Sequence, residues 1–303
     1  VEYVLGVIRR GVAGIRLHAC QDVRYQYQYR YFDSVGKSRV EGYVTPHLYA
    51  ETLSLYGDGK RLGTFLIHNV HPTTKELWVG DFTAEYPGYC IEKLRQEYPG
   101  EFFTFLLGPA GDISPHFVRK ERTYEEMIRL AELLRQEFDT QLRAQTPDAL
   151  KPVRLRFEQT TFPKERVPVE RSRMEIPTHC FPEEQKVLAQ LDGTAPMRPR
   201  RELRPFEQVK EYHVSHLIFS EEYSIIFEPF ELYSEYYGAV NKSRCTIATI
   251  SNGFEHYLTG WYLRRLSMHG SLSGFSDGMR KRLWEILGRW SCQETLLQEE
   301  NRP

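Results

Sequence analysis

Hydrophobic and polar residues alternate, or group into short apolar runs, in several stretches of the chain. Residues 23–32 (VRYQYQYRYF) and 152–162 (PVRLRFEQTTF) alternate with a period of two, which predicts β-strands with one buried face. Residues 62–72 (LGTFLIHNVHP) and 102–112 (FFTFLLGPAGD) are apolar runs that end in proline, glycine or aspartate, which favours buried strands. Residues 85–100 between these runs have helical spacing, so the three segments predict a βαβ unit.

Helical periodicity is clearest at residues 123–145. Thr123 and Glu126 have the spacing of a capping box, and an apolar stripe repeats every three or four positions behind them. That stripe consists of Met127, Leu130, Leu134, Phe138 and Leu142. A terminal helix is predicted at residues 278–290 (GMRKRLWEILGRW).

The chain opens on an amphipathic pattern (VEYVLGVIRRGVAGIRL) that differs from a signal peptide because it has no small-residue cleavage site. Its apolar positions Val4, Ile8, Val12 and Ile15 repeat at helical spacing. We therefore expect that the sequence starts inside a helix and that the natural N-terminus lies upstream.

The second half of the chain also mixes strands and helices. Residues 211–220 and 223–230 predict paired strands, residues 231–240 a helix, and residues 245–251 an apolar strand. Residues 163–210 are rich in proline, arginine and glutamate, which predicts an exposed excursion and not a separate domain. Residues 1–303 are thus expected to form one α/β domain, with a single mixed sheet and flanking helices.

Composition narrows the function classes. The 303 residues carry 40 Lys+Arg and 41 Asp+Glu, so no excess of positive charge indicates a nucleic-acid partner. No apolar run approaches the roughly 20 residues of a membrane helix, and no transmembrane segment is predicted. The five cysteines are scattered without a C-x-x-C pair, which argues against a disulfide framework and favours a reducing, cytoplasmic setting.

Three groups of polar residues follow apolar strands. His68 and His71 are three positions apart, so on a regular strand they point to opposite faces, and a hydrogen-bonded structural role is the simpler interpretation of either one. The turn GPAGDISPH presents Ser114 on a glycine-rich backbone, as a nucleophile, an oxyanion donor or merely a capping residue. Glu228 ends a strongly apolar strand before Pro229, where it would bind a metal, be paired, or cap a helix.

Five segments in order resemble the neutral/alkaline non-lysosomal ceramidase family, over residues 1 to about 290. They are HNVHPTT, GDFTAEYPGY, LGPAGDISPH, FEPFELY and ISNGFEHYLT. The resemblance implies a ceramidase-like fold and a zinc-dependent amidohydrolase that cleaves an N-acyl (ceramide-like) amide bond. Its partners would be an N-acyl lipid or another small amide substrate.

The family's functional residues carry over by motif. The resemblance implies that His71, Glu228 and Tyr257 are zinc ligands, that Ser114 is the catalytic serine, and that Arg30 contacts the substrate. Either Ser114 or a zinc-activated water would be the nucleophile.

One family motif, an upstream H-T-H-S-G-P segment with a further zinc histidine, does not occur in these 303 residues. Either the sequence is truncated or the protein is a degenerate member, in which His18 or His68 would have to substitute. Two alternatives therefore stay open. One is a metal-free binding protein on the same fold, and the other is a zinc hydrolase of a different small amide or ester.

Overall fold

The computed structural model describes residues 2–14, 20, 22–40, 45, 47–74, 83–163, 211–251, 257–260 and 277–291. The expected excursion at 163–210 lies almost wholly outside the described residues, and so does His18.

Two mixed sheets form the centre of the molecule. The first has the order β5-β4-β3-β1-β7, and only β4 and β5 are parallel within it. Its strands are β1 (Arg24–Tyr31), β3 (Tyr49–Gly57), β4 (Lys60–His68), β5 (Phe102–Leu107) and β7 (Lys151–Pro152). The second has the order β12-β10-β9-β8, with β10 and β12 parallel. Its strands are β8 (Arg156–Pro163), β9 (Glu211–Ser220), β10 (Tyr223–Phe227) and β12 (Cys245–Ala248).

Two short ladders complete the strands. In one, β2 (Lys37–Ser38) pairs with β6 (Ile113–Ser114) in antiparallel fashion, and in the other β11 (Glu231–Leu232) pairs with β13 (Tyr257–Leu258) in parallel. Each joins segments that are distant in the sequence.

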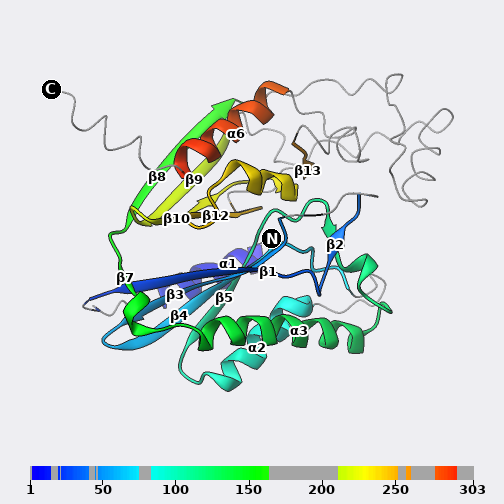
Figure 1. Ribbon diagram of the computed structural model, residues 1–303, viewed down its shortest axis with the longest axis vertical. Helices are drawn as coiled ribbons and strands as arrows, with labels where there is room; N and C mark the ends of the chain where they lie inside the picture. Colours follow the sequence, from blue (N-terminus) through cyan, green and yellow to red (C-terminus); the bar gives the residue numbers. More distant parts are fainter. Residues whose placement is uncertain are drawn as a thin grey trace.

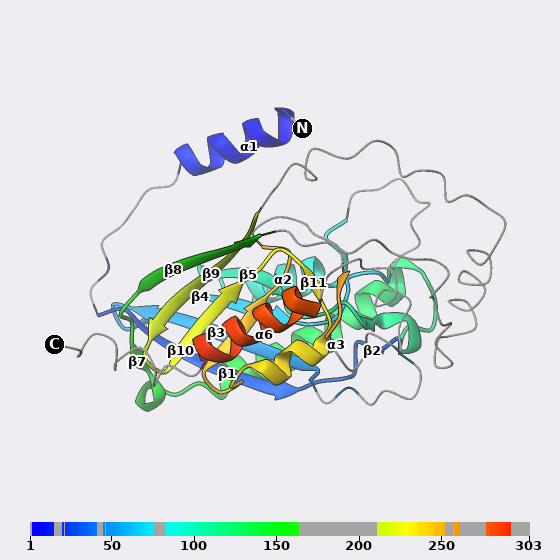
Figure 2. The same cartoon turned by 90° about the horizontal axis from the view of Figure 1, so that it is seen from above.

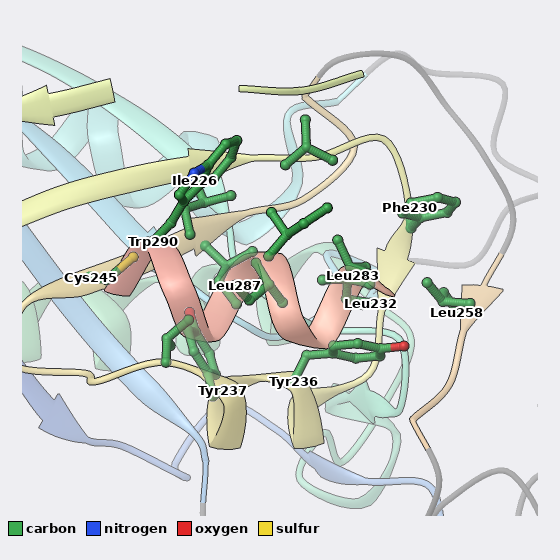
Figure 3. Close-up of a cluster of buried hydrophobic side chains, with 14 of the residues drawn as sticks. Ile226, Phe230, Leu232, Tyr236, Tyr237, Cys245, Leu258, Leu283, Leu287 and Trp290 are labelled. Carbon is green, nitrogen blue, oxygen red and sulfur yellow. The ribbon is translucent and has the colours of Figure 1, made fainter. Parts of the chain in front are cut away.

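Helices cover the outer faces of the two sheets, which gives four layers (Figure 1). The helices α2 (Glu85–Glu97) and α3 (Tyr124–Arg143) pack on the first sheet, and α6 (Asp277–Ser291) packs on the second. Short 3₁₀ helices are η1 (Pro115–Phe117), η2 (Pro147–Ala149) and η5 (Ser234–Ala239). Figure 3 shows Leu283, Leu287 and Trp290 of α6 against strand and η5 side chains.

The remaining helix, α1 (Glu2–Ala13), lies apart from the sheets (Figure 2). Its side chains Tyr3, Leu5, Val7 and Val12 are exposed. No helix among the described residues is long and apolar enough to cross a membrane.

A buried ion pair crosses between the layers. Lys242 Nζ lies 2.5 Å from Oε1 of Glu51, and Glu51 is fully buried on β3. The phenols of Tyr27 and Tyr237 donate to the same carboxylate at 2.9 and 2.8 Å, and Lys242 also donates to Thr246 at 2.8 Å. These contacts connect the first sheet to the segment that precedes β12. Both charged groups are buried, and a buried charge without a partner is costly.

The α/β fold class is confirmed, and the sequence located most elements. The βαβ unit is present as β4, α2 and β5, and Thr123 caps α3 by accepting the Glu126 N–H at 3.3 Å. Two details differ. The segment 231–240 forms β11 and η5 instead of a helix, and two sheets replace the single one that we expected. The two sheets pack face to face because both carry apolar residues on their inner faces, such as Leu53 and Ile225.

Candidate active site

His71 lies three residues beyond β4, at the edge of the first sheet. Its backbone N–H donates to the carbonyl of Ile113 at 3.2 Å, which places it beside β6. Its Nε2 atom lies 3.4 Å from Oε2 of Glu231 and 3.5 Å from the phenol oxygen of Tyr257. An imidazole, a carboxylate and a phenol from three separate segments therefore meet at one point.

The ladder of β11 and β13 brings Glu231 and Tyr257 together, because these two residues are paired in register. Burial disfavours the charged form of Glu231, but His71, Tyr257 and Arg39 outweigh it and hold the pKa of the carboxyl below its ordinary value. Burial, and then the neighbouring Glu231, raise the pKa of Tyr257 to about 12, while Arg39 opposes this rise. In the absence of a metal, Tyr257 is a neutral phenol beside a carboxylate.

Arg39 adds a positive charge to this group. Its guanidinium carbon lies 6.0 Å from the centre of the Tyr257 ring, and its Nη2 donates to the carbonyl of Gly111 at 3.0 Å. The backbone N–H of Arg39 donates to the carbonyl of Asp112 at 2.7 Å. Both the backbone and the guanidinium of Arg39 are thus bonded to the Gly111–Asp112 turn.

The turn at Gly111 and Asp112 is the scaffold of the site. Gly111 donates to the carbonyl of Leu232 at 2.7 Å, and a Cβ at this glycine would lie 2.6 Å from the Tyr233 ring, so only glycine permits the approach. The buried Asp112 carboxylate accepts hydrogen bonds from Ser38 Oγ at 3.0 Å and from Ser234 N and Oγ at 2.7 and 3.0 Å. Burial raises the pKa of Asp112, although these hydrogen bonds oppose the rise.

Ser114 is the next residue after Ile113, so it lies beside the backbone of His71. It is buried in β6, opposite Lys37, and its hydroxyl accepts the His116 N–H at 3.2 Å as the N-cap of η1. No hydrogen bond joins its hydroxyl to His71 or Tyr257 in the part of the chain that the structure describes. The structure therefore places Ser114 near the group by backbone pairing and not by side-chain contact.

The structure describes no contact between Glu228, the ligand that the F-E-P-F motif implied, and this group. Glu228 is fully buried, and its Oε2 accepts the Phe230 N–H at 2.7 Å. No described contact links it to His71 or Tyr257, and the carboxylate beside His71 belongs to Glu231. The motif contains both glutamates, and only the pairing of β11 with β13 distinguishes them.

Arg30 also lies elsewhere. It is exposed on β1 and lies 3.5 Å from Glu137 of α3, so this ion pair belongs to the outer face of the first sheet. The arginine of the site is Arg39, which no periodicity marks in the sequence. Its position one residue after the two-residue strand β2 becomes informative only when the pairing of β2 with β6 is known.

His68 has the structural role that the sequence favoured for a lone histidine. It is fully buried, its Nδ1 lies 2.6 Å from the Tyr49 carbonyl oxygen, and burial lowers its pKa to about 4. A histidine with this pKa is neutral at pH 7, and no described contact places His68 beside His71.

The three donor atoms suit a zinc ion. Zinc bonds of about 2.0–2.2 Å at tetrahedral angles separate neighbouring ligand atoms by roughly 3.3–3.5 Å. The distances of 3.4 and 3.5 Å from His71 Nε2 match this separation. Within the described part of the chain, the buried Oε2 of Glu231 accepts no hydrogen bond of normal geometry. Among the described residues, no group of three or more His, Cys, Asp or Glu side chains could hold a metal ion. A phenol is therefore the third candidate ligand.

Two solved structures share this fold. A neutral ceramidase from Pseudomonas aeruginosa matches with a TM-score of 0.65 and 13% identity over 95% of this chain and 54% of that one. A ceramidase complexed with C2 matches with a TM-score of 0.64 and 12% identity over 92% and 54% of the two chains. The chain thus spans about half the length of these proteins. No protein-family model matches the chain, and no curated protein sequence does. At this identity the likeness shows a neutral-ceramidase fold, and function has to be argued from the site.

Proposed function

We propose that the protein is a zinc-dependent amidohydrolase that acts on an N-acyl, ceramide-like amide bond. The observation that carries this proposal is that Glu231 Oε2 and the Tyr257 phenol oxygen both lie within 3.5 Å of His71 Nε2. The neutral-ceramidase fold supports the choice of an amide substrate.

His71, Glu231 and Tyr257 would hold the zinc ion with one nitrogen and two oxygen ligands. When bound, zinc supplies Lewis-acid polarisation of the amide carbonyl and lowers the pKa of water. The parallel ladder fixes the carboxylate and phenol before any ion arrives, because their backbones are already paired. The fixed geometry reduces the ordering that binding would otherwise require.

Arg39 is suited to stabilise the negative charge that develops on the amide oxygen. Its guanidinium is held by the Gly111 carbonyl, so it is oriented before the substrate binds. Preorganised cationic donors of this kind lower the barrier because they need no rearrangement during the reaction.

Ser114 would supply the hydroxyl group of the reaction. Two roles are consistent with its position in β6. In the first, the hydroxyl oxygen attacks the carbonyl carbon, the C–N bond breaks, the amine leaves with the serine proton, and water then hydrolyses the acyl-serine to release the fatty acid. In the second, the hydroxyl only donates a hydrogen bond while water attacks the carbonyl and the amine leaves. Rapid quenching and mass spectrometry distinguish them, since only the first adds an acyl group to the Ser114 peptide.

The proposal is tested on the purified chain with zinc alone and with N-acyl substrates. We expect about one zinc per chain, release of fatty acid from an N-acyl sphingoid amide, and loss of both on Glu231→Ala. Glu222→Gln removes an exposed carboxylate that pairs with Lys151, and it should change neither property. Hydrolysis of short acyl amides but not of N-acyl sphingoid amides would show that the substrate is another small amide. A wild-type protein that binds no zinc would contradict the enzyme assignment.

One observation favours the second candidate, a metal-free binding protein. Arg39 already helps to neutralise Glu231, so the carboxylate has a cationic neighbour without any metal. In that case an N-acyl lipid would bind with the same affinity in the presence and absence of a chelator, without hydrolysis.

A further inference from the structure

We propose that Glu228 is a positioning residue, whose side-chain hydrogen bond to the backbone of Phe230 fixes the direction in which Glu231 leaves the second sheet. This inference rests on the proposed function, because it assigns a role relative to Glu231. It differs from the direct metal ligation that the motif implied for Glu228.

Glu228 lies where two neighbouring strands end. It directly follows β10, and its N–H donates to the carbonyl of Ala248, the last residue of the parallel strand β12, at 3.1 Å. Its own carbonyl accepts the N–H of Ser251 at 3.0 Å. Two segments continue from here. The first segment, which follows β10, leads to Glu231, and the second segment, which follows β12, leads towards Tyr257.

The side chain of Glu228 holds the first of these segments. Its Oε2 accepts the N–H of Phe230 at 2.7 Å, which closes a tight turn around Pro229. Phe230 in turn accepts the N–H of Ile250 at 3.3 Å through its carbonyl. One carboxyl group therefore fixes the residue that immediately precedes Glu231, and that residue is bonded to the second segment.

The second segment needs such support because its backbone is strained. Ile250 has a φ of 56°, in the left-handed region that a β-branched residue rarely adopts. Conformations of this kind cost roughly 1–3 kcal/mol each and persist only where the surroundings impose them. Two hydrogen bonds hold this backbone in place. The N–H of Ile250 donates to the carbonyl of Phe230, and the N–H of Ser251 donates to the carbonyl of Glu228.

The hydrogen bond to Phe230 explains why this buried position carries a side chain with an acceptor oxygen. The side chain is fully buried, and among the described residues its Oε1 atom has no hydrogen-bond partner and no ion pair includes it. Burial raises the pKa of Glu228 well above the usual value, which favours the neutral acid over the carboxylate, and glutamine is a neutral side chain of the same length that keeps an acceptor oxygen. An apolar residue of similar size would avoid the cost of burial but would leave the Phe230 N–H unpaired.

The test compares Glu228→Gln with Glu228→Leu, and with Glu228→Ala if leucine prevents folding. Ser224→Ala is the matched control, because Ser224 is buried at the other end of β10. Zinc affinity is measured with zinc chloride and a competing chelator, and backbone protection at residues 228–233 and 249–251 is measured by hydrogen exchange.

We expect Glu228→Gln and the control to keep zinc affinity within about 3-fold and to keep the exchange protection. The leucine or alanine variant should lose about 10–100-fold in zinc affinity, the range typical for residues that orient a ligand, and should exchange faster at Phe230. Loss of zinc in Glu228→Gln as complete as in Glu231→Ala would overturn the proposal and make Glu228 a ligand. Unchanged zinc affinity and protection in the leucine or alanine variant would overturn it as well.

Failure of the proposed function gives a different result. If the wild-type protein binds no zinc, the hydrolase assignment falls, and hydrogen exchange alone decides whether Glu228 fixes this backbone. Equal protection in all variants then removes the positioning role too.

Discussion

Glu231 and Tyr257 are paired residues in the parallel ladder of β11 and β13, and both side chains approach the same nitrogen of His71. Paired residues of neighbouring strands project from the same face, so a two-residue ladder is enough to place a carboxylate and a phenol together. The described part of the site is therefore assembled by backbone pairing, and its side chains add the chemistry.

Tyr257→Phe should weaken zinc binding without unfolding the protein. The change removes only the phenol oxygen and keeps the ring, which packs edge-on against Tyr233 at 6.4 Å. We expect zinc affinity to fall by at least about 10-fold and the thermal midpoint to change little, as for other isosteric changes. Competition titration and calorimetry measure the two quantities. A midpoint that drops sharply together with the affinity would assign Tyr257 to packing.

Ser114→Ala should leave zinc bound and lower turnover. The hydroxyl makes no described contact with His71, so metal affinity should stay within about 3-fold, while kcat should fall by about 100-fold or more if the hydroxyl takes part in the reaction. Loss of the cap on η1 should cost about 1 kcal/mol of stability. The variant Thr123→Ala, which removes the cap of α3 instead, is the control for this stability term. An unchanged kcat in Ser114→Ala would contradict a catalytic role.

Glu51→Gln should destabilise the protein severely. It leaves the buried Lys242 charge without its carboxylate, and breaking a buried pair in this way typically costs about 3–5 kcal/mol. The double variant Glu51→Gln/Lys242→Met removes both charges and should recover much of the loss. Urea unfolding of the single and double variants measures the coupling. Equal stabilities of wild type and Glu51→Gln would show that the pair contributes little.

Stability should decrease as the pH falls below neutral, and His216 should account for part of this. It is fully buried and stacked on Trp290 at 4.8 Å. Neither ring nitrogen has a hydrogen-bond partner among the described residues, Glu158 lies 3.8 Å from Nδ1, and burial lowers the pKa of His216 to about 4. The folded state therefore binds a proton less readily than the unfolded state, in which histidine has a pKa near 6.5. Its contribution is complete above about pH 6.5 and is lost as the pH falls towards about 4.

The variant His216→Phe keeps the stacking and removes the titration. Urea unfolding at pH 7.5 and pH 5 should show a smaller difference in unfolding free energy for this variant than for wild type. His213→Phe, on the same strand, is the control, because His213 is exposed. An identical pH dependence of wild type and His216→Phe would contradict the interpretation.

Local sequence patterns predicted the elements that depend on local interactions. The stripe of α3 and its Thr123 cap, and the apolar runs of β4 and β5, are visible in the sequence because spacing and capping act over a few residues. The motifs also singled out His71 and Tyr257, and the structure places the phenol oxygen of Tyr257 3.5 Å from Nε2 of His71.

Contacts between distant segments could not be predicted in the same way. Glu228 and Glu231 are chemically identical and three residues apart, and only the pairing of β11 with β13 shows which one reaches His71. Arg39 becomes a site residue through hydrogen bonds to Gly111 and Asp112, far along the chain. The division into two sheets likewise depends on which strands pair, which a period of two does not specify.

The anchoring of the Gly111–Asp112 turn makes the guanidinium of Arg39 and the carboxylate of Glu231 dependent on one short piece of backbone. The backbone of His71 is bonded to Ile113, the next residue along, so the imidazole depends on the same piece of chain. A substitution that displaces the turn would therefore disturb the carboxylate, the guanidinium and the imidazole together, and a rigid turn preserves their mutual distances.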